Sequence, residues 1–108
     1  MGKFVISVRK SGEFQFNLEA GNGRIILTSE GYSSKSGCLG GIESVKSHVA
    51  DADNFERLTS TNNKFYFVLK ATNGKVIGTS EMYESSAACL NGIASVQENA
   101  VNAITEEG

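Results

Sequence analysis

Three stretches near the start of the chain carry the pattern of half-buried β-strands. Apolar and polar side chains alternate over residues 3–9 and again over residues 14–20. Residues 24–30 are rich in β-branched side chains, which favour strands. Between the second and third stretches stands Asn22-Gly23, a pair that predicts a tight hairpin turn with positive φ at both positions. The pattern therefore predicts three strands, with the last two joined as a hairpin.

The hydrophobic period then lengthens to that of an amphipathic helix. Apolar residues recur at steps of four, three and four positions, which places them in one stripe along the helix. These residues are Cys38, Ile42, Val45 and Val49. Ser33 or Ser34 is expected to cap the first turn with its side-chain oxygen.

The same succession of patterns occurs twice. A shift of 51 positions lays residues 3–49 on residues 54–100, and nineteen of these 47 positions are then identical. Chance alone would match about one position in fifteen, so the chain contains a duplication. In the second copy the strand alternation is clear over residues 65–71, whereas Glu56 and Arg57 weaken the first strand. The helical stripe repeats as Cys89, Ile93, Val96 and Ala100.

Two glycines at equivalent positions lie inside the predicted helices. Gly41 and Gly92 each cost up to about 1 kcal/mol relative to alanine in a helix interior. Their presence in both copies indicates that each helix approaches the sheet closely.

The predicted fold class is α+β, because each copy alternates strands with one helix. A single copy of about fifty residues would bury only about 60% of its surface. We therefore expect one domain over residues 1–108, made of two tandem β-β-β-α repeats at residues 3–49 and 54–100. The repeats would share one antiparallel sheet, with both helices packed on one face. Residues 50–54 are a short acidic linker, and residues from Val101 onward are expected to be frayed.

Composition and charge limit the classes of protein. Hydrophobic residues make up 40% of the chain and charged residues 20%, so a core can form. The formal net charge is −2, which excludes a strongly basic nucleic-acid clamp and a polyanionic tail. The longest aliphatic run, residues 25–27, is far shorter than the ~20 residues of a membrane span. Because no charged-then-apolar leader opens the chain, we expect a cytoplasmic protein with two reduced thiols.

The duplicated motifs resemble those of a known family. Each copy carries Phe-x-Phe-x-Leu-x-Ala, Asn-Gly, Thr-Ser-Glu-x-Tyr, a serine cap and Gly-Ile-x-Ser-Val, and this combination resembles the YegP-like family of small bacterial proteins. The resemblance covers nearly the whole chain and implies tandem β-β-β-α repeats that share a single sheet. Cys38 and Cys89 stand where the family usually has alanine, and Gly40 replaces an asparagine that Asn91 retains. The family has no established activity, so the resemblance implies an architecture and almost no function.

One duplicated group of polar residues lies where the last strand of each copy meets the start of its helix. The group is Ser29, Glu30, Tyr32 and Ser34, repeated as Ser80, Glu81, Tyr83 and Ser85. A helix start can hold an anion, and as a binding hypothesis the tyrosines and hydroxyls would line two related pockets. As an enzyme hypothesis, Glu30 and Glu81 would form a carboxylate pair for general acid–base catalysis. As a structural alternative, the glutamates would bond helix-start amides while the tyrosines pack against the sheet edge.

Cysteine and histidine offer two further hypotheses. Cys38 and Cys89 would form a redox pair or, as we favour, occupy the core as small apolar residues. His48 with Asp51 and Asp53 would make a weak metal site, but a histidine at a helix C-terminus is also favoured by the helix dipole. We therefore expect no metal.

The remaining surface offers two other candidates. The basic residues are scattered, so nucleic-acid binding is not expected; they include Arg9, Lys10, Arg24 and Lys35. The uncovered face of the sheet would be polar in the first copy and partly apolar in the second, which makes it a candidate contact surface. Its residues are Gln15, Asn17 and Glu19 in the first copy and Tyr66, Val68 and Lys70 in the second.

We expect a small cytoplasmic monomer that acts by binding a small ligand or a protein partner, without cofactor, metal, membrane or nucleic acid. The chain lacks a P-loop, a dinucleotide fingerprint and a metal-ligand cluster, and we assign no catalytic residue. The alternative is a protein-interaction or structural accessory protein that uses the open sheet face. An enzyme built on the duplicated Ser-Glu-x-Tyr sites comes third.

Overall fold

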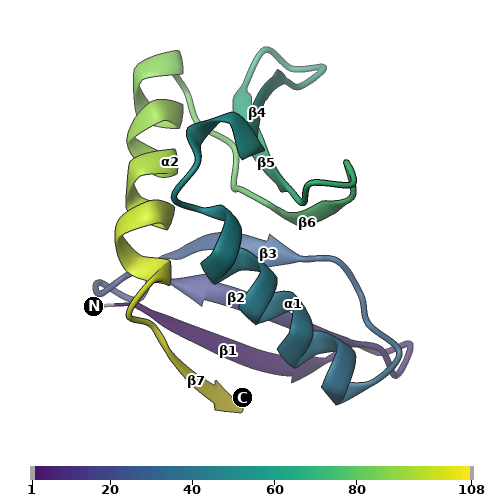
Figure 1. Cartoon of the computed structure of the whole chain (residues 1–108). Coiled ribbons are helices and arrows are strands. Elements are labelled where there is room, and N and C mark those ends of the chain that lie inside the picture. The colour runs from purple at the N-terminus through teal and green to yellow at the C-terminus, as the bar shows by residue number, and fades with distance from the viewer. Residues whose placement is uncertain (1, 108) are drawn as a thin grey trace.

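A computed structural model describes residues 2–107 of the chain. Within that range one sheet holds strands in the order β4-β5-β6-β3-β2-β1-β7, and two helices cover it (Figure 1). The strands are β1 (Lys3–Val8), β2 (Phe14–Glu19), β3 (Ile25–Ser29), β4 (Phe55–Thr59), β5 (Phe65–Lys70), β6 (Val76–Thr79) and β7 (Ile104–Glu107). The helices are α1 (Lys35–His48) and α2 (Ser86–Ala100), with a short 3-10 helix η1 (Ala52–Asn54) between α1 and β4.

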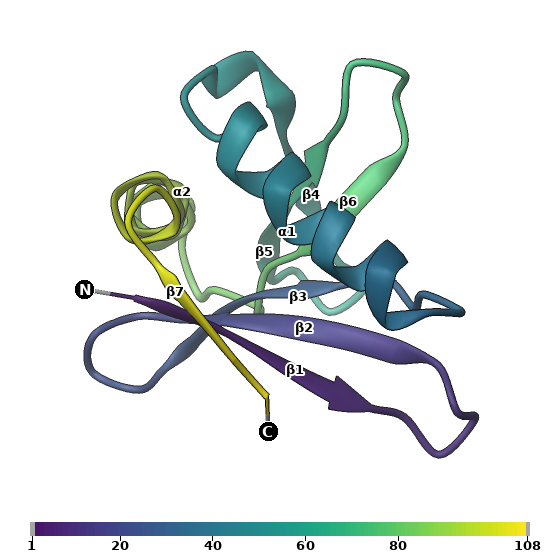
Figure 2. The same ribbon diagram turned by 60° about the horizontal axis from the view of Figure 1, so that its bottom comes forward.

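The two repeats meet at the centre of the sheet, where β3 pairs antiparallel with β6. Thr28 lies opposite Thr79, its equivalent under the shift of 51 positions, so the two repeats are related by an approximate twofold axis at this pair. Both helices lie on the same side of the sheet (Figure 2). The predicted fold class is therefore confirmed: two β-β-β-α units share one sheet with both helices on one face.

The core lies between this face and the helices. Phe4, Phe16 and Phe67 are fully buried, and so are the predicted stripe residues of α1. Burial of each such phenylalanine, isoleucine or valine side chain contributes about 1.5–3 kcal/mol. In the second stripe Ile93 is only partly buried, at the margin of the core. The hydrophobic alternation of the sequence thus identifies the residues that hold the sheet against the helices.

The turns that join β2 to β3 and β5 to β6 differ from the predicted tight turn. Gly23 has φ 85°, but Asn22 has no positive φ. Gly23 N donates to Ala20 O at 2.9 Å, and Ala20 N donates to Arg24 O at 2.9 Å, so the loop has three residues and ends in a glycine bulge. Asn22 Oδ1 accepts from Arg24 N at 3.0 Å, which stabilises the turn. The prediction of positive φ at both Asn22 and Gly23 was therefore wrong. The hydrogen bond from Arg24 N to the Asn22 side chain stabilises a three-residue loop in place of the predicted two-residue turn.

The C-terminal segment is a strand, and the expectation of fraying from Val101 onward was wrong for residues 104–107. β7 pairs in parallel with β1, whereas every other pair in the sheet is antiparallel. Lys3 Nζ lies 3.2 Å from Glu106, and Lys35 Nζ lies 2.5 Å from Glu107. These partners are far away along the chain, so the local sequence around β7 does not reveal them.

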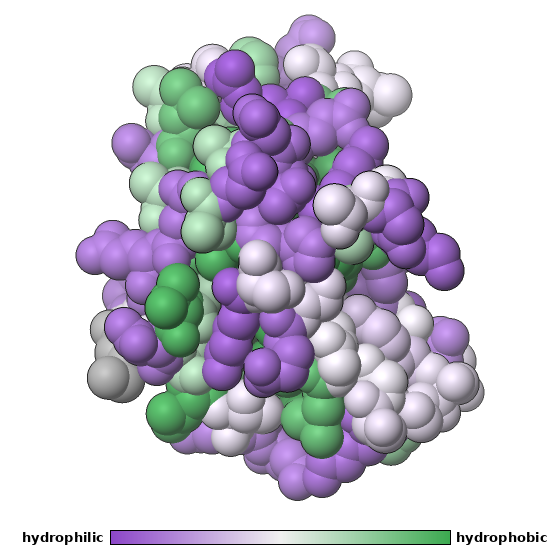
Figure 3. All heavy atoms as spheres, in the orientation of Figure 1, coloured by the Kyte–Doolittle hydropathy of each residue, from purple (hydrophilic) through white to green (hydrophobic). Residues whose placement is uncertain are grey.

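The outer face of the sheet offers a smaller apolar surface than its sequence predicted. Val68 is only 7% exposed, and Tyr66 is half-buried. Lys70 forms an ion pair with Glu56 of the neighbouring strand. The side that carries the helices, seen in the orientation of Figure 1, is largely polar, with apolar residues in separate spots (Figure 3). Within residues 2–107 no helix is long and apolar enough to cross a membrane.

Candidate functional site

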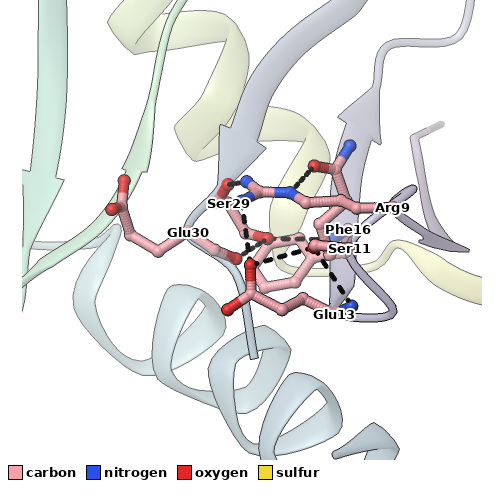
Figure 4. Close-up of polar contacts among 7 residues, drawn as sticks. Arg9, Ser11, Glu13, Phe16, Ser29 and Glu30 are labelled. Carbon is pink, nitrogen blue, oxygen red and sulfur yellow. Dashed lines mark hydrogen bonds and ion pairs between the residues drawn. The ribbon is translucent and has the colours of Figure 1, made fainter. Parts of the chain in front are cut away.

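The predicted site residues begin with two serines that complete the sheet. Ser29 is 3% exposed, and its Oγ accepts from Phe16 N at 2.8 Å and donates to Glu30 O at 2.8 Å (Figure 4). Ser80 makes the same two contacts in the second copy, because its Oγ accepts from Phe67 N at 2.9 Å and donates to Glu81 O at 2.8 Å. Each hydroxyl thus satisfies backbone groups at the end of a strand, and it is not directed into a pocket.

The serines at the helix starts are caps. Ser34 Oγ accepts from Gly37 N, and Ser85 Oγ accepts from Ala88 N, each at 3.0 Å. The predicted cap of the first helix is therefore Ser34 and not Ser33. Among the described residues neither Glu30 nor Glu81 bonds a helix-start amide, and the carboxylate of Glu81 accepts from Arg24. That part of the structural alternative was wrong.

The two tyrosines stand against their helices. Tyr32 continues β3 by an isolated bridge to Phe14, with N–O distances of 2.7 Å in both directions. Its ring stacks on Phe16 at a centroid distance of 6.3 Å, and a Cβ built at Gly41 would lie 2.6 Å from Cζ of that ring. The predicted close approach at Gly41 is confirmed, and the partner is this tyrosine. Burial raises the pKa of Tyr32.

The second repeat carries the same arrangement. Tyr83 forms an isolated β-bridge to Phe65, and its ring stacks on Phe67 at a centroid distance of 6.3 Å. The ring also lies against Gly92, because a Cβ built on this glycine would be 2.5 Å from Cζ of Tyr83. Its pKa is also raised, and burial is the main cause. The tyrosine rings are therefore fixed parts of the framework, and each forms part of a pocket wall.

Each tyrosine lines a cleft made by both repeats. The β2–β3 hairpin and the start of α2 enclose a cavity of about 400 Å³ that contains Glu81 and Tyr83. The β5–β6 hairpin and α1 enclose an equivalent cavity of about 650 Å³ that contains Glu30 and Tyr32. We call these the Tyr83 cleft and the Tyr32 cleft. In each of them the hairpin of one repeat faces the helix of the other.

The clefts include residues that the sequence analysis did not assign to the site. In the Tyr83 cleft these are Asn22, Arg24, Ile26, Asn91 and Ser95. In the Tyr32 cleft they are Asn73, Lys75, Ile77, Gly40 and Ser44. These ten residues form five equivalent pairs under the shift of 51, whereas Glu84 and Ala88 line only the Tyr83 cleft and Val76 lines only the Tyr32 cleft. Sequence reasoning missed the hairpin residues because they belong to the other repeat, and no local motif links them to the tyrosine.

Among the described residues, an ion pair joins the charged side chains of the Tyr83 cleft but not those of the Tyr32 cleft. Arg24 Nε donates to Glu81 Oε2 at 2.9 Å, and Arg24 Nη2 donates to Oε1 at 2.5 Å. This contact raises the pKa of Arg24. In the Tyr32 cleft the equivalent groups are Lys75 and Glu30, and neither side chain forms an ion pair or hydrogen bond within the described part of the chain. Glu30 extends away from the contacts of Ser29, toward the strands of the second repeat (Figure 4).

The Tyr32 cleft is also wider at its helix. Gly40 occupies the position of Asn91, and a Cβ built on Gly40 would meet no atom within 4 Å. The departure from the family pattern at Gly40 therefore lies on the wall of a cavity. The Tyr32 cleft combines a carboxylate, an ammonium group and an aromatic ring in one open space.

Glu30 and Glu81 do not form a carboxylate pair. They follow the ends of β3 and β6, which run in opposite directions, and each lines its own cleft. In the observed register they are about four residues apart along the strands, or roughly 13 Å. The structure therefore does not bring together the two groups of the enzyme hypothesis.

The cysteines and the histidine lie elsewhere. Cys38 and Cys89 are free and at most 1% exposed, and burial raises the pKa of both thiols. His48 Nδ1 lies 2.7 Å from Ser44 O, so this nitrogen carries the proton that is donated to the carbonyl. Among residues 2–107, no group of three or more histidine, cysteine or carboxylate side chains is placed to hold a metal ion.

The fold and its paired clefts define a two-repeat α+β protein. A family model described as a domain of unknown function, DUF1508, matches residues 10–56 and 60–107, and the chain belongs to this family. It is 51% identical over 102 residues to the "UPF0339 protein in ptx operon 5'region" of Stutzerimonas stutzeri, covering 94% of this chain and 92% of that protein. It is 45% identical to the UPF0339 protein YegP of Yersinia pestis, covering 99% of this chain and 96% of that protein.

Two solved structures have the same fold. The solution structure of YegP from E. coli, described as a protein of unknown function, matches with a TM-score of 0.94 at 42% identity, covering 99% of this chain and 92% of that one. The solution structure of a UPF0339 protein from Shewanella oneidensis matches with a TM-score of 0.92 at 44% identity, covering 98% and 90%. The predicted resemblance to the YegP-like family is confirmed. The division into one domain with units 3–49 and 54–100 stays a prediction.

Proposed function

We propose that this protein is a non-enzymatic binding module of the bacterial cytoplasm, and that its Tyr32 cleft holds a small zwitterionic ligand. One observation carries the proposal. In the equivalent cleft Arg24 and Glu81 are paired with each other, whereas Lys75 and Glu30 line the Tyr32 cleft without partners among the described residues. A ligand with both an ammonium and a carboxylate group would supply the missing partner of each charge.

The wall of the cleft favours a ligand with a small apolar part. The half-buried ring of Tyr32 and the side chain of Ile77 offer apolar surface, and the absent side chain at Gly40 leaves room beside α1. Charged groups fix the orientation of a ligand in such a cleft, and apolar contacts contribute affinity. Free amino acids are the simplest probes with this chemistry.

The proposal is tested by amide NMR of the labelled protein against pooled free amino acids, followed by the matching amines and carboxylic acids that carry a single charge. We expect chemical shift changes at residues 30–32, 40–41 and 73–77 with zwitterions, and weaker changes with the singly charged analogues. E30Q and K75Q should each weaken binding at least tenfold. The matched control E81Q, in the other cleft, should leave the shifts at Tyr32 unchanged. Shifts elsewhere, no shift with any pool, or equal binding by all variants would overturn the proposal.

A further inference from the structure

The two edges of the sheet differ although the repeats are equivalent. β7 covers the outer edge of β1, whereas within residues 2–107 the equivalent strand β4 pairs with β5 alone. In Figure 1, β4 and β7 stand at opposite ends of the molecule. Alternate residues of β4 therefore direct their backbone N–H and C=O groups away from the sheet.

A groove runs along this free edge. Its volume is about 750 Å³, and it is lined by residues 53–59 together with Phe65, Lys70, Ser86 and Cys89. Under the shift of 51 positions, residues 53–59 correspond to residues 2–8. These contain β1, along which β7 runs. Ser86 corresponds to Lys35, which contacts Glu107 of β7 at 2.5 Å. The groove beside β4 is thus the counterpart of the space that β7 fills beside β1.

We propose that this groove binds an extended segment of a partner protein, which adds to β4 as a parallel strand and places an acidic side chain beside Arg57. The β1–β7 pair supplies the register. Ile6 lies opposite Glu107, so the equivalent residue of a bound segment lies opposite Arg57. Arg57 is exposed and forms no ion pair within the described part of the chain. Strand addition of this kind gains affinity from backbone hydrogen bonds and specificity from alternate side chains.

The charges on β4 favour a partner segment over a second copy of this chain. If β7 of a second copy occupied the groove in the same register, its Glu106 would face Glu56. If two β4 strands paired antiparallel about their centres, Arg57 would face Arg57 or Glu56 would face Glu56. Like charges directly opposite one another destabilise a strand pair. The groove therefore fits a segment that is acidic opposite Arg57 and neutral or basic opposite Glu56.

A short peptide tests this directly. The probe has the sequence of residues 101–107 with E106K, and it is acetylated and amidated to remove the terminal charges. Amide NMR of the full chain should show shifts over residues 54–59 and 86–89. A peptide that carries E107K in addition should bind at least tenfold more weakly, and so should the first peptide to the R57E variant. The doubly substituted peptide should recover affinity for R57E. The charge-reversed control K10E, in the loop after β1, should bind as the unchanged protein does.

Three outcomes would overturn the inference. Shifts confined to β1 and β7 would mean that the peptide displaces the native strand. No shift at millimolar peptide would mean that the groove does not accept a strand. Equal affinities for the two peptides would mean that Arg57 does not select an acidic side chain. Amide spectra of R57E without peptide establish that this surface variant is folded.

Discussion

The two repeats share their framework, but they differ at both of the places where a ligand or partner would bind. The residues that are identical in both copies include the serine that completes the strand, the tyrosine that stacks on phenylalanine, and the glycine beneath that tyrosine. The clefts differ in their charged groups, and the sheet edges differ in whether a strand covers them. The two copies therefore keep the same framework contacts around the tyrosine and differ in the partners of their cleft charges and in the cover of their outer strands.

Removal of the buried serine hydroxyl from either repeat should cause the greatest loss of stability, and the two losses show whether the shared framework is equivalent in the two repeats. S29A and S80A each leave a buried backbone N–H without its acceptor, so each should lower the free energy of unfolding by about 1–3 kcal/mol. Urea denaturation measures both. S33A removes an exposed hydroxyl and should change stability by less than about 0.5 kcal/mol. If S29A and S80A lowered the free energy of unfolding by clearly different amounts, the two serines would not be equivalent parts of the framework.

Neighbouring glycines of α1 should respond in opposite directions. G41A would force a Cβ into the ring of Tyr32 and should cost about 1–2 kcal/mol, because overpacking exceeds the gain in helix propensity. G92A should behave alike against Tyr83. G40A meets open space and should stabilise the protein by up to about 1 kcal/mol. If thermal unfolding showed that G41A raises the melting temperature as G40A does, the close contact between Gly41 and the ring of Tyr32 would be contradicted.

Alkaline pH should destabilise both repeats alike. Burial raises the pKa of Cys38 and Cys89, so the unfolded chain loses these protons at a lower pH than the folded protein does. Above about pH 8.5, the ordinary pKa of a thiol, the unfolded state binds fewer protons, and the free energy of unfolding falls as pH rises. Below that pH the thiols have no such effect. The C38A and C89A variants should each flatten the decline, as measured by urea denaturation at several pH values. Identical slopes in the variants and the unchanged protein would contradict the burial of the thiols.

The coupling free energy between the two charged side chains of a cleft should be small, and it should distinguish the Tyr83 cleft from the Tyr32 cleft. A double-mutant cycle with R24Q and E81Q should give a favourable coupling that salt weakens, since both side chains are partly exposed. The equivalent cycle with K75Q and E30Q should give none. K75R introduces the longer guanidinium group and should create a coupling with Glu30 like that between Arg24 and Glu81. An existing coupling between Lys75 and Glu30 would remove the difference on which the proposed ligand site depends.

Sequence patterns predicted the elements well, since strand and helix periods reflect which side chains face the core. They also singled out a duplicated group of polar residues at the strand ends, but not the contact that each of them makes. The four serines of the predicted site lie beside the clefts and bond the backbone, whereas the glutamates and tyrosines line them. The prediction could not separate these roles, because a serine in a motif has the same sequence signal whether its hydroxyl bonds the backbone or faces a ligand.

Sequence by itself therefore determined the duplication, the strands and helices, the core stripe and the close approach at Gly41, all of which depend on residues that are neighbours along the chain or repeat at a fixed spacing. Only the tertiary structure decided that Lys75 joins Glu30 in one cleft, that β7 adds to β1, and that the edge of β4 stays open. Each of these depends on contacts between segments separated by dozens of residues. Such contacts arise only when the two repeats pair across β3 and β6, and no local period encodes that pairing.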